Sequence, residues 1–137
     1  MKMLQIGTGR WGANHLRVLS DLSVDLYVAE LSAEKRRECI ERGLQEDRVS
    51  GDFLDFVDEV PAVDVVTPAP THYPLCKELL QRGKDIFIEK PMTETSAQGG
   101  NGSSSSEARR QAHQQGRLEY CHRVMHLAIS QRLLKIA

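Results

Sequence analysis

Three glycines near the N-terminus are spaced as in a turn that binds phosphate groups. Gly7, Gly9 and Gly12 form a G-x-G-x-x-G motif that follows an apolar segment and precedes a helical pattern. The first glycine permits a tight turn, the second lets a pyrophosphate approach the backbone, and the third lets helix and strand pack closely. The N-terminus of the helix offers free N–H groups and partial positive charge to an anion. The motif therefore predicts binding of a dinucleotide or a related nucleotide.

A carboxylate at the end of the second expected strand would complete the adenosine half of this site. Glu30 follows residues 24–29 and is placed to accept hydrogen bonds from both hydroxyls of an adenosine ribose. Its charge would repel the 2′-phosphate of NADP, and neither Leu31 nor Ser32 supplies a compensating cation. The basic residues 35–37 lie in the first turn of a helix, where such side chains are usually solvated. We therefore expect NAD in preference to NADP.

Strand and helix patterns alternate along the part of the chain that contains these residues. Strands are expected at residues 3–6, 24–29, 49–50, 63–66, 85–88 and 118–121, and helices at 13–22, 33–42, 52–60 and 71–82. This alternation implies a parallel sheet with helices on both faces. The expected fold class is α/β, a three-layer doubly wound parallel sheet of the Rossmann type with about six strands.

Two of the expected helices carry specific signals. Ser32 is a suitable N-cap for the helix at 33–42. In the helix at 71–82, Pro74 is expected in the first turn, where a missing N–H costs little. The apolar stripe of that helix is expected to consist of Leu75, Cys76, Leu79 and Leu80.

Two further segments follow expected strands at the edge where a doubly wound sheet binds its ligands. Residues 66–72 follow the fourth strand, and residues 88–91 follow the fifth. Lys90 is the cation best placed to reach a nicotinamide ribose or a substrate hydroxyl, and Pro91 would stiffen its turn. His72 begins a helix at this edge, so a ligand contact and a structural role are both open for it.

These motifs together resemble the N-terminal domain of the glucose–fructose oxidoreductase, inositol dehydrogenase and rhizopine-catabolism (Gfo/Idh/MocA) family. The resemblance covers residues 2–97 and, more loosely, 107–123. It rests on the glycine motif with Trp11, Asn14 and His15, on Thr67-Pro68 with His72, and on Glu89-Lys90-Pro91. It implies an oxidoreductase that passes hydride from a sugar or cyclitol hydroxyl to a nicotinamide. Trp11-Gly12-x-Asn14 is most similar to members that act on nucleotide sugars.

The resemblance also implies the residues of the site. Lys90 would orient the substrate and assist proton transfer. The residues expected to bind the cofactor are Gly7, Thr8, Gly9, Arg10, Trp11, Gly12, Glu30, Leu31, Thr67, Pro68, Ala69, Thr71, His72, Glu89 and Lys90.

The chain also departs from the family pattern. A flexible Gly/Ser loop is expected at residues 98–106, within one dinucleotide-binding domain spanning 1–137, and the family's substrate domain is absent. We therefore expect the chain to bind NAD and to turn over substrate only if a second domain is supplied.

Composition limits the other functions that the chain could have. Its 137 residues suffice for one core, and 18 basic against 19 acidic residues leave a net charge of -1. This balance, with 5% aromatic residues, argues against nucleic-acid binding. No segment predicts a membrane span or a signal peptide, and three widely spaced cysteines fit a cytoplasmic protein. His122 and His126 are the nearest approach to a metal motif, and we expect no metal site.

Two alternative functions and one possible assembly follow from the same residues. A stand-alone NAD-sensing module, like the regulatory domains of potassium transporters, has a similar glycine turn but lacks Glu89-Lys90-Pro91. A methyltransferase also combines a glycine turn with an acidic ribose ligand, but Thr67-Pro68 and Glu89-Lys90-Pro91 fit dehydrogenases better. The apolar stripe at residues 129–136 is expected to promote homo-oligomers.

Overall fold

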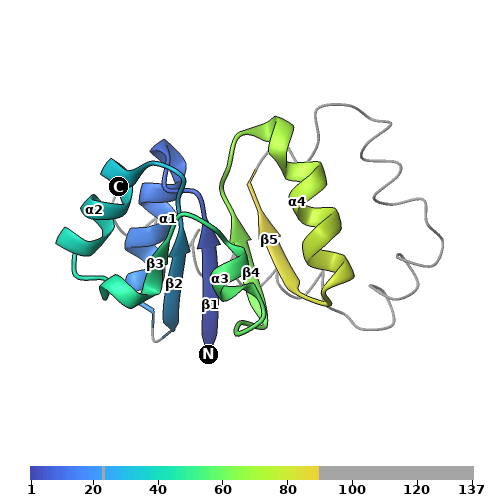
Figure 1. Cartoon of the computed structure of the whole chain (residues 1–137), viewed down its shortest axis with the longest axis horizontal. Coiled ribbons are helices and arrows are strands. Elements are labelled where there is room, and N and C mark those ends of the chain that lie inside the picture. The colour runs from blue at the N-terminus through green and yellow to red at the C-terminus, as the bar shows by residue number, and fades with distance from the viewer. Residues whose placement is uncertain (23, 90–137) are drawn as a thin grey trace. The chain divides into compact units, whose positions relative to one another are not determined.

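The computed structural model describes residues 1–22 and 24–89. The chain forms two compact units, Met1–Thr67 and Pro68–Ala137. The first unit contains β1 (Lys2–Ile6), α1 (Arg10–Ser20), β2 (Asp25–Ala29), α2 (Ala33–Glu41), the 3-10 helix η1 (Glu46–Arg48), β3 (Val49–Ser50), α3 (Leu54–Val57) and β4 (Ala62–Val65). The second contains α4 (Ala69–Gln81) and β5 (Asp85–Ile88). Each strand expected before residue 89 is therefore present (Figure 1).

The strands of the first unit form a parallel sheet in the order β3-β2-β1-β4. β1 has β2 on one side and β4 on the other, so the order of the strands reverses at β1. In open α/β sheets, ligands bind beyond the carboxyl ends of the strands at such a reversal. The glycine motif begins at this end of β1, directly after Ile6.

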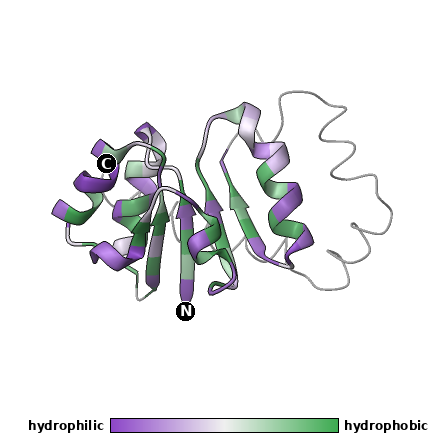
Figure 2. Cartoon of the chain, viewed as in Figure 1, coloured by the Kyte–Doolittle hydropathy of each residue, from purple (hydrophilic) through white to green (hydrophobic). Residues whose placement is uncertain are grey.

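Helices cover both faces of this sheet. Gln5 of β1 is in register with Asp64 of β4, so their side chains share one face, and His15 of α1 contacts Asp64 there. Tyr27 of β2 lies on the other face, where its ring centroid is 5.1 Å from that of Phe56 in α3. Strands covered on both faces are mostly apolar, and Figure 2 shows hydrophobic residues along much of β1, β2 and β4. The predicted three-layer α/β arrangement is confirmed.

The first two helices begin where their N-terminal residues permit. α1 starts at Arg10, three residues before the expected start, because the second half of the glycine motif already has helical backbone and Gly9 is the N-cap. α2 starts as expected, with the Ser32 hydroxyl accepting a hydrogen bond from the Lys35 N–H at 3.4 Å. The glycine turn therefore leads into a helix without an intervening loop.

The expected place of Pro74 was wrong, because α4 begins earlier than the sequence pattern suggests. Pro68 is the N-cap, and Pro70 lies in the first turn, where a missing N–H costs little. Pro74 consequently lies inside the helix. It leaves the backbone carbonyl of Pro70 without its usual donor four residues ahead.

The expected apolar stripe of α4 was also partly wrong. Leu79 is buried, but Leu75 and Cys76 are only partly covered, and Leu80 is 40% exposed. His72, at the start of the helix, is only 1% exposed. The spacing of apolar residues thus predicts the helix correctly but does not predict which of its side chains are buried.

Several expected features lie outside the described residues. These are Lys90, the loop at 98–106, the strand at 118–121, the histidines His122 and His126, and the stripe at 129–136. Within residues 1–22 and 24–89, none of the helices is long and apolar enough to cross a membrane.

Candidate functional site

The first and third glycines of the motif are required by the backbone itself. Gly7 has a φ of +94°, and a Cβ atom there would lie 2.7 Å from the Val66 carbonyl oxygen. A Cβ atom on Gly12 would lie 2.3 Å from the Gly7 carbonyl oxygen. Both positions are too crowded for any side chain. The end of β1, the first turn of α1 and the segment after β4 therefore meet closely here.

The second glycine is in open space instead. Gly9 has an ordinary φ of −59°, and a Cβ atom there would meet nothing within 4 Å. Its backbone borders the start of α1, where no side chain of the described residues caps the N–H groups and no acidic residue lies in the first turn. The first N–H groups of a helix have no partner within the helix, so this opening suits an anion.

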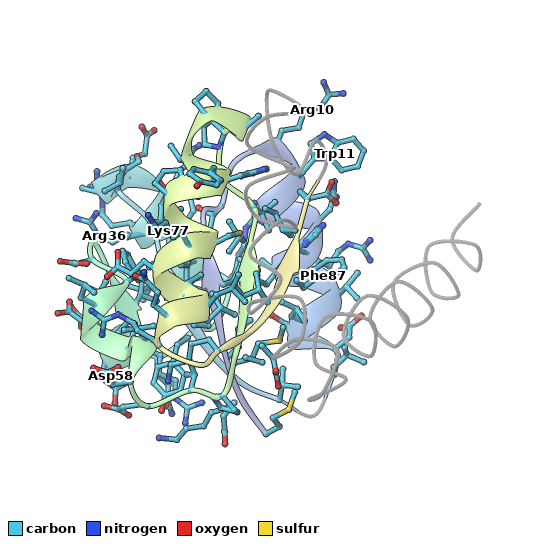
Figure 3. All side chains as sticks on the ribbon, turned by 90° about the vertical axis from the view of Figure 1, so that its right-hand side faces the viewer. Arg10, Trp11, Arg36, Asp58, Lys77 and Phe87 are labelled. Carbon is cyan, nitrogen blue, oxygen red and sulfur yellow. The ribbon has the colours of Figure 1, made fainter. Side chains whose placement is uncertain are left out.

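Two large side chains flank this opening. Arg10 is exposed, and Trp11 is 62% exposed although it is a large apolar residue. Figure 3 shows both side chains extending outward from the start of α1. A cation and an indole are therefore available beside the free N–H groups.

Glu30 is hydrogen-bonded to the glycine turn itself. Its Oε2 accepts the Thr8 backbone N–H at 2.7 Å and the Thr8 hydroxyl at 2.8 Å, and its Oε1 accepts the Ser32 N–H at 2.9 Å. Burial alone would raise the pKa of Glu30, but these bonds to the charged form hold its pKa below the usual value. The carboxylate is therefore ionised and fixed beside the turn.

These internal bonds limit what Glu30 can offer a ribose. A carboxylate has about four lone-pair positions, and three donors already occupy Glu30. One ribose hydroxyl can bind without rearrangement, whereas the expected pair requires one protein donor to leave. The Thr8 hydroxyl is the donor that can rotate away. Leu31, the next residue in the chain, is apolar and 90% exposed.

Arg36 is not simply solvated, contrary to the expectation for the basic residues of α2. Its Nη1 donates to the backbone carbonyl oxygens of Glu30 at 2.7 Å and Leu31 at 2.8 Å. The side chain is half-buried and lies against Gly51, where a Cβ atom would be 3.2 Å from Nη1. Arg36 therefore holds the segment that carries the carboxylate.

The remaining expected residues fall into three groups. Thr67 lies beside the glycine turn, because its Cγ2 would be 3.2 Å from a Cβ atom on Gly7. Pro68, Ala69 and Thr71 form the start of α4, where the Thr71 N–H and hydroxyl donate to the Pro68 carbonyl at 2.9 Å and 2.7 Å. His72 is buried, Glu89 is half-buried after β5, and Lys90 lies outside the described residues.

Sequence reasoning missed a buried polar cluster beneath the turn. Gln5 is completely buried, and its Nε2 donates to the carbonyl oxygens of Gly7 at 2.9 Å and Gly12 at 2.8 Å. His15 Nδ1 lies 2.9 Å from Asp64 Oδ2, and both side chains are buried. The available signal was a polar residue in the middle of each of two apolar strands.

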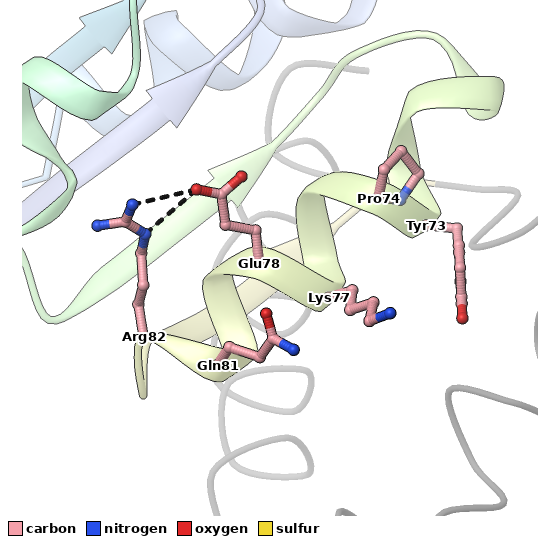
Figure 4. A pocket seen from close by; sticks show the side chains of 6 residues that line it. All are labelled: Tyr73, Pro74, Lys77, Glu78, Gln81 and Arg82. Atoms are coloured by element: carbon pink, nitrogen blue, oxygen red, sulfur yellow. Dashed lines mark hydrogen bonds and ion pairs between the residues drawn. The ribbon is translucent and has the colours of Figure 1, made fainter.

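Outside the glycine turn, the described residues form a surface pocket but no metal-ligand cluster. Within residues 1–22 and 24–89, no group of three His, Cys, Asp or Glu side chains could hold a metal ion. Among the described residues, a surface pocket is lined by α4 and by Arg82, its C-cap, with the Glu78–Arg82 ion pair at one end (Figure 4). Its lining residues are Tyr73, Pro74, Lys77, Glu78, Gln81 and Arg82.

Comparison with known proteins gives one family. Residues 1–113 match the model of the oxidoreductase family with an NAD-binding Rossmann fold, Gfo/Idh/MocA. The chain is 32% identical over 97 residues to inositol 2-dehydrogenase of Rhodococcus jostii, covering 68% of this chain and 26% of that protein. It is 32% identical over 92 residues to scyllo-inositol 2-dehydrogenase (NAD(+)) of Bacillus subtilis, covering 64% and 27%.

Solved structures give the same fold. The UDP-N-acetylglucosamine 3-dehydrogenase of Acidithiobacillus ferrooxidans superposes with a TM-score of 0.68 at 26% identity, covering 80% of this chain and 34% of that one. By contrast with this structural match, the sequence matches to the two inositol dehydrogenases of Rhodococcus jostii and Bacillus subtilis span about a quarter of the length of those proteins. With the glycine turn, the adjoining carboxylate and the parallel sheet, these matches show that the chain belongs to the Gfo/Idh/MocA oxidoreductase family as an NAD-binding Rossmann domain.

Proposed function

We propose that this chain binds NAD(H) at the glycine turn, as the cofactor half of a sugar or cyclitol dehydrogenase. The observation that carries this proposal is the contrast among the three glycines. Gly7 and Gly12 are enclosed by backbone, whereas the space beside Gly9 is open and borders the uncapped start of α1. A pyrophosphate fits this donor set because its oxygens can accept the free N–H groups of the helix.

The adenosine half of the cofactor would lie toward Glu30. The ionised carboxylate can accept one ribose hydroxyl directly, and a second if the Thr8 hydroxyl rotates away. Leu31 offers apolar surface next to it for an adenine ring. The same negative charge disfavours a 2′-phosphate, which supports NAD over NADP.

Residues Thr67, Pro68, Ala69, Thr71, His72 and Glu89 are assigned to the rest of the cofactor site by the family resemblance. When bound, the nicotinamide accepts or donates hydride. Lys90 would orient the substrate hydroxyl and assist transfer of its proton. The relatives' names indicate inositols and a nucleotide sugar as their substrates, so the proposed substrate class is a polyhydroxylated ring.

Calorimetric titration of the chain with NAD⁺, NADH, NADP⁺ and S-adenosylmethionine tests the proposed cofactor. NAD⁺ or NADH should bind most tightly, and a ligand at about 100 times its Kd should stabilise the chain by about 2.7 kcal/mol. Absence of binding by both forms of NAD would contradict the proposal. Preferential binding of S-adenosylmethionine would indicate a methyltransferase instead.

A chimera tests the proposed reaction separately. Residues 1–113, the part that matches the family model, would replace the corresponding segment of the Rhodococcus jostii inositol 2-dehydrogenase. We expect the chimera to reduce NAD⁺ when inositol is added, and its Lys90→Met variant to lose most of this activity while still binding NADH. A Lys90→Met chimera with full activity would contradict the role given to Lys90.

A further inference from the structure

Gln5 is an unusual residue for its position in the sheet. It lies in β1 between Leu4 and Ile6, and its side chain is fully shielded from solvent. A buried amide that lacks hydrogen bonds costs about 1–3 kcal/mol in proteins, so apolar residues are the rule at such positions. The hydrogen bonds that Gln5 makes are therefore the feature to explain.

The amide of Gln5 joins the two ends of the glycine turn. Its Nε2 donates one hydrogen to the Gly7 carbonyl and the other to the Gly12 carbonyl. Both acceptors are carbonyl oxygens, so only the NH₂ end of the amide can serve, and the orientation of the side chain is fixed by chemistry. Its Oε1 has no hydrogen-bond partner among the residues that the structure describes. The contribution of Gln5 is thus to donate two hydrogen bonds to the turn.

These two carbonyls belong to the segments that set the direction of the free N–H groups. Gly7 carries the left-handed backbone of the turn, and Gly12 lies in the first turn of α1. Gly9, Arg10 and Trp11 lie between them, with their N–H groups at the open start of the helix. A bond from one rigid strand residue to both ends therefore fixes the angle at which these donors face a ligand.

A second buried contact holds the same helix one turn further along. His15 of α1 bonds to Asp64 of β4, and Asp64 is the register neighbour of Gln5. The helix is thus tied to the sheet independently of Gln5. Loss of the Gln5 bonds should consequently loosen the turn without releasing α1.

We propose that Gln5 is a positioning residue for the pyrophosphate, acting through the carbonyls of Gly7 and Gly12. This inference rests on the proposed NAD(H) function. A positioning role differs from a purely structural one in a measurable way. Loss of the Gln5 donors should weaken the binding of ligands that have phosphates more than the binding of ligands that lack them. Adenosine lacks phosphates and would contact Glu30, which the Ser32 N–H also holds at 2.9 Å, so its binding should depend less on Gln5.

The test compares Gln5→Met and Gln5→Glu with wild type, using NADH, ADP-ribose and adenosine as ligands in NMR titrations of the full chain. Methionine keeps the length of the side chain without its donors, whereas a buried glutamate facing two carbonyl oxygens is favoured in its protonated form, which has one donor. We expect Gln5→Met to weaken binding of NADH and ADP-ribose at least fivefold and of adenosine less than twofold, and Gln5→Glu to weaken binding less than Gln5→Met. Gln81→Met, an exposed substitution in α4, is the matched control and should change none of the three affinities.

Each outcome has a defined meaning. If NADH, ADP-ribose and adenosine weaken equally in Gln5→Met, Gln5 only supports the fold and the inference is wrong. Unchanged affinity for all three also overturns it. If Gln5→Glu does not fold, the inference is tested by the ligand affinities of Gln5→Met and by the NMR chemical shifts of the amides of residues 9–12 in that variant. Wild-type protein that binds neither NADH nor ADP-ribose would refute the proposed function itself, independently of Gln5.

Discussion

Replacing Gly9 or Gly12 by alanine should show whether each glycine serves cofactor binding or the stability of the fold. At Gly9 the new Cβ meets no atom within 4 Å, and the φ of −59° suits alanine. The expected change in the free energy of unfolding is therefore within about 1 kcal/mol. At Gly12 the Cβ would lie 2.3 Å from the Gly7 carbonyl oxygen, so backbone must move. Overpacking of this kind costs about 1–3 kcal/mol.

The effects on cofactor binding follow from the same geometry. A methyl group on Gly9 would project into open space at the N-cap of α1, where we propose that the pyrophosphate binds. Each charge-assisted hydrogen bond contributes about 1.5–3 kcal/mol, so losing one weakens NADH by roughly 10- to 150-fold. Gly9→Ala should therefore fold as wild type and bind NADH poorly. Gly12→Ala should lose stability even without any ligand.

Trp11 makes the assay direct, because the chain has 1 tryptophan and it adjoins the turn. Energy transfer from Trp11 to bound NADH gives the Kd, and thermal unfolding without ligand gives the stability. A Gly9→Ala protein that unfolds well below wild type would show that the space is not open. A folded Gly9→Ala protein with wild-type NADH affinity would refute the placement of the pyrophosphate.

Three further predictions concern single side chains. Calorimetry should show that Glu30→Ser raises the affinity for NADP⁺ relative to NAD⁺ at least about fivefold, since two like charges 4 Å apart repel by about 1 kcal/mol even in water. An unchanged ratio of the two affinities would contradict the role of Glu30. Because hydrogen bonding lowers the pKa of Glu30 from 4.5, the stability it contributes is present above pH 4.5 and declines as the pH falls through its lower folded value. The free energies of unfolding of wild type and Glu30→Gln should therefore converge below pH 4.5. Parallel curves of stability against pH would contradict this contribution of Glu30. Burial raises the pKa of the Cys76 thiol to about 11, so peptide mapping should detect slow alkylation of folded protein at pH 8, and rapid labelling there would show the thiol to be accessible.

The features that sequence patterns located correctly depend on local chemistry. A G-x-G-x-x-G motif between a strand and a helix can adopt few backbone conformations. The positive φ of Gly7 and the close packing around Gly12 agree with the conformation that the motif predicts. The strand ends and the Ser32 cap were likewise determined within a few residues of sequence. These elements could be predicted because neighbouring residues alone decide them.

Other features depended on contacts between distant residues. The bonds from Gln5 to Gly12 and from His15 to Asp64 become visible only when β1, α1 and β4 are together. The three donors on Glu30 were missed for the same reason, since Thr8 is far from it in sequence. Pro74 lies inside α4 rather than in its first turn, because the helix starts at Ala69, five residues before Pro74 and two before the expected start.

The bonds around Glu30 have a consequence for how cofactor preference could change during evolution or by design. The carboxylate occupies the N–H groups of Thr8 and Ser32 and the Thr8 hydroxyl, with the Arg36 guanidinium on the adjoining carbonyls. Removing the carboxylate would leave those donors facing the same space beside a cation, which is the composition of an anion site. A single substitution would therefore convert a position that repels a phosphate into one that attracts it. If the cofactor lies as proposed, substitution of Glu30 alone should shift the preference from NAD toward NADP.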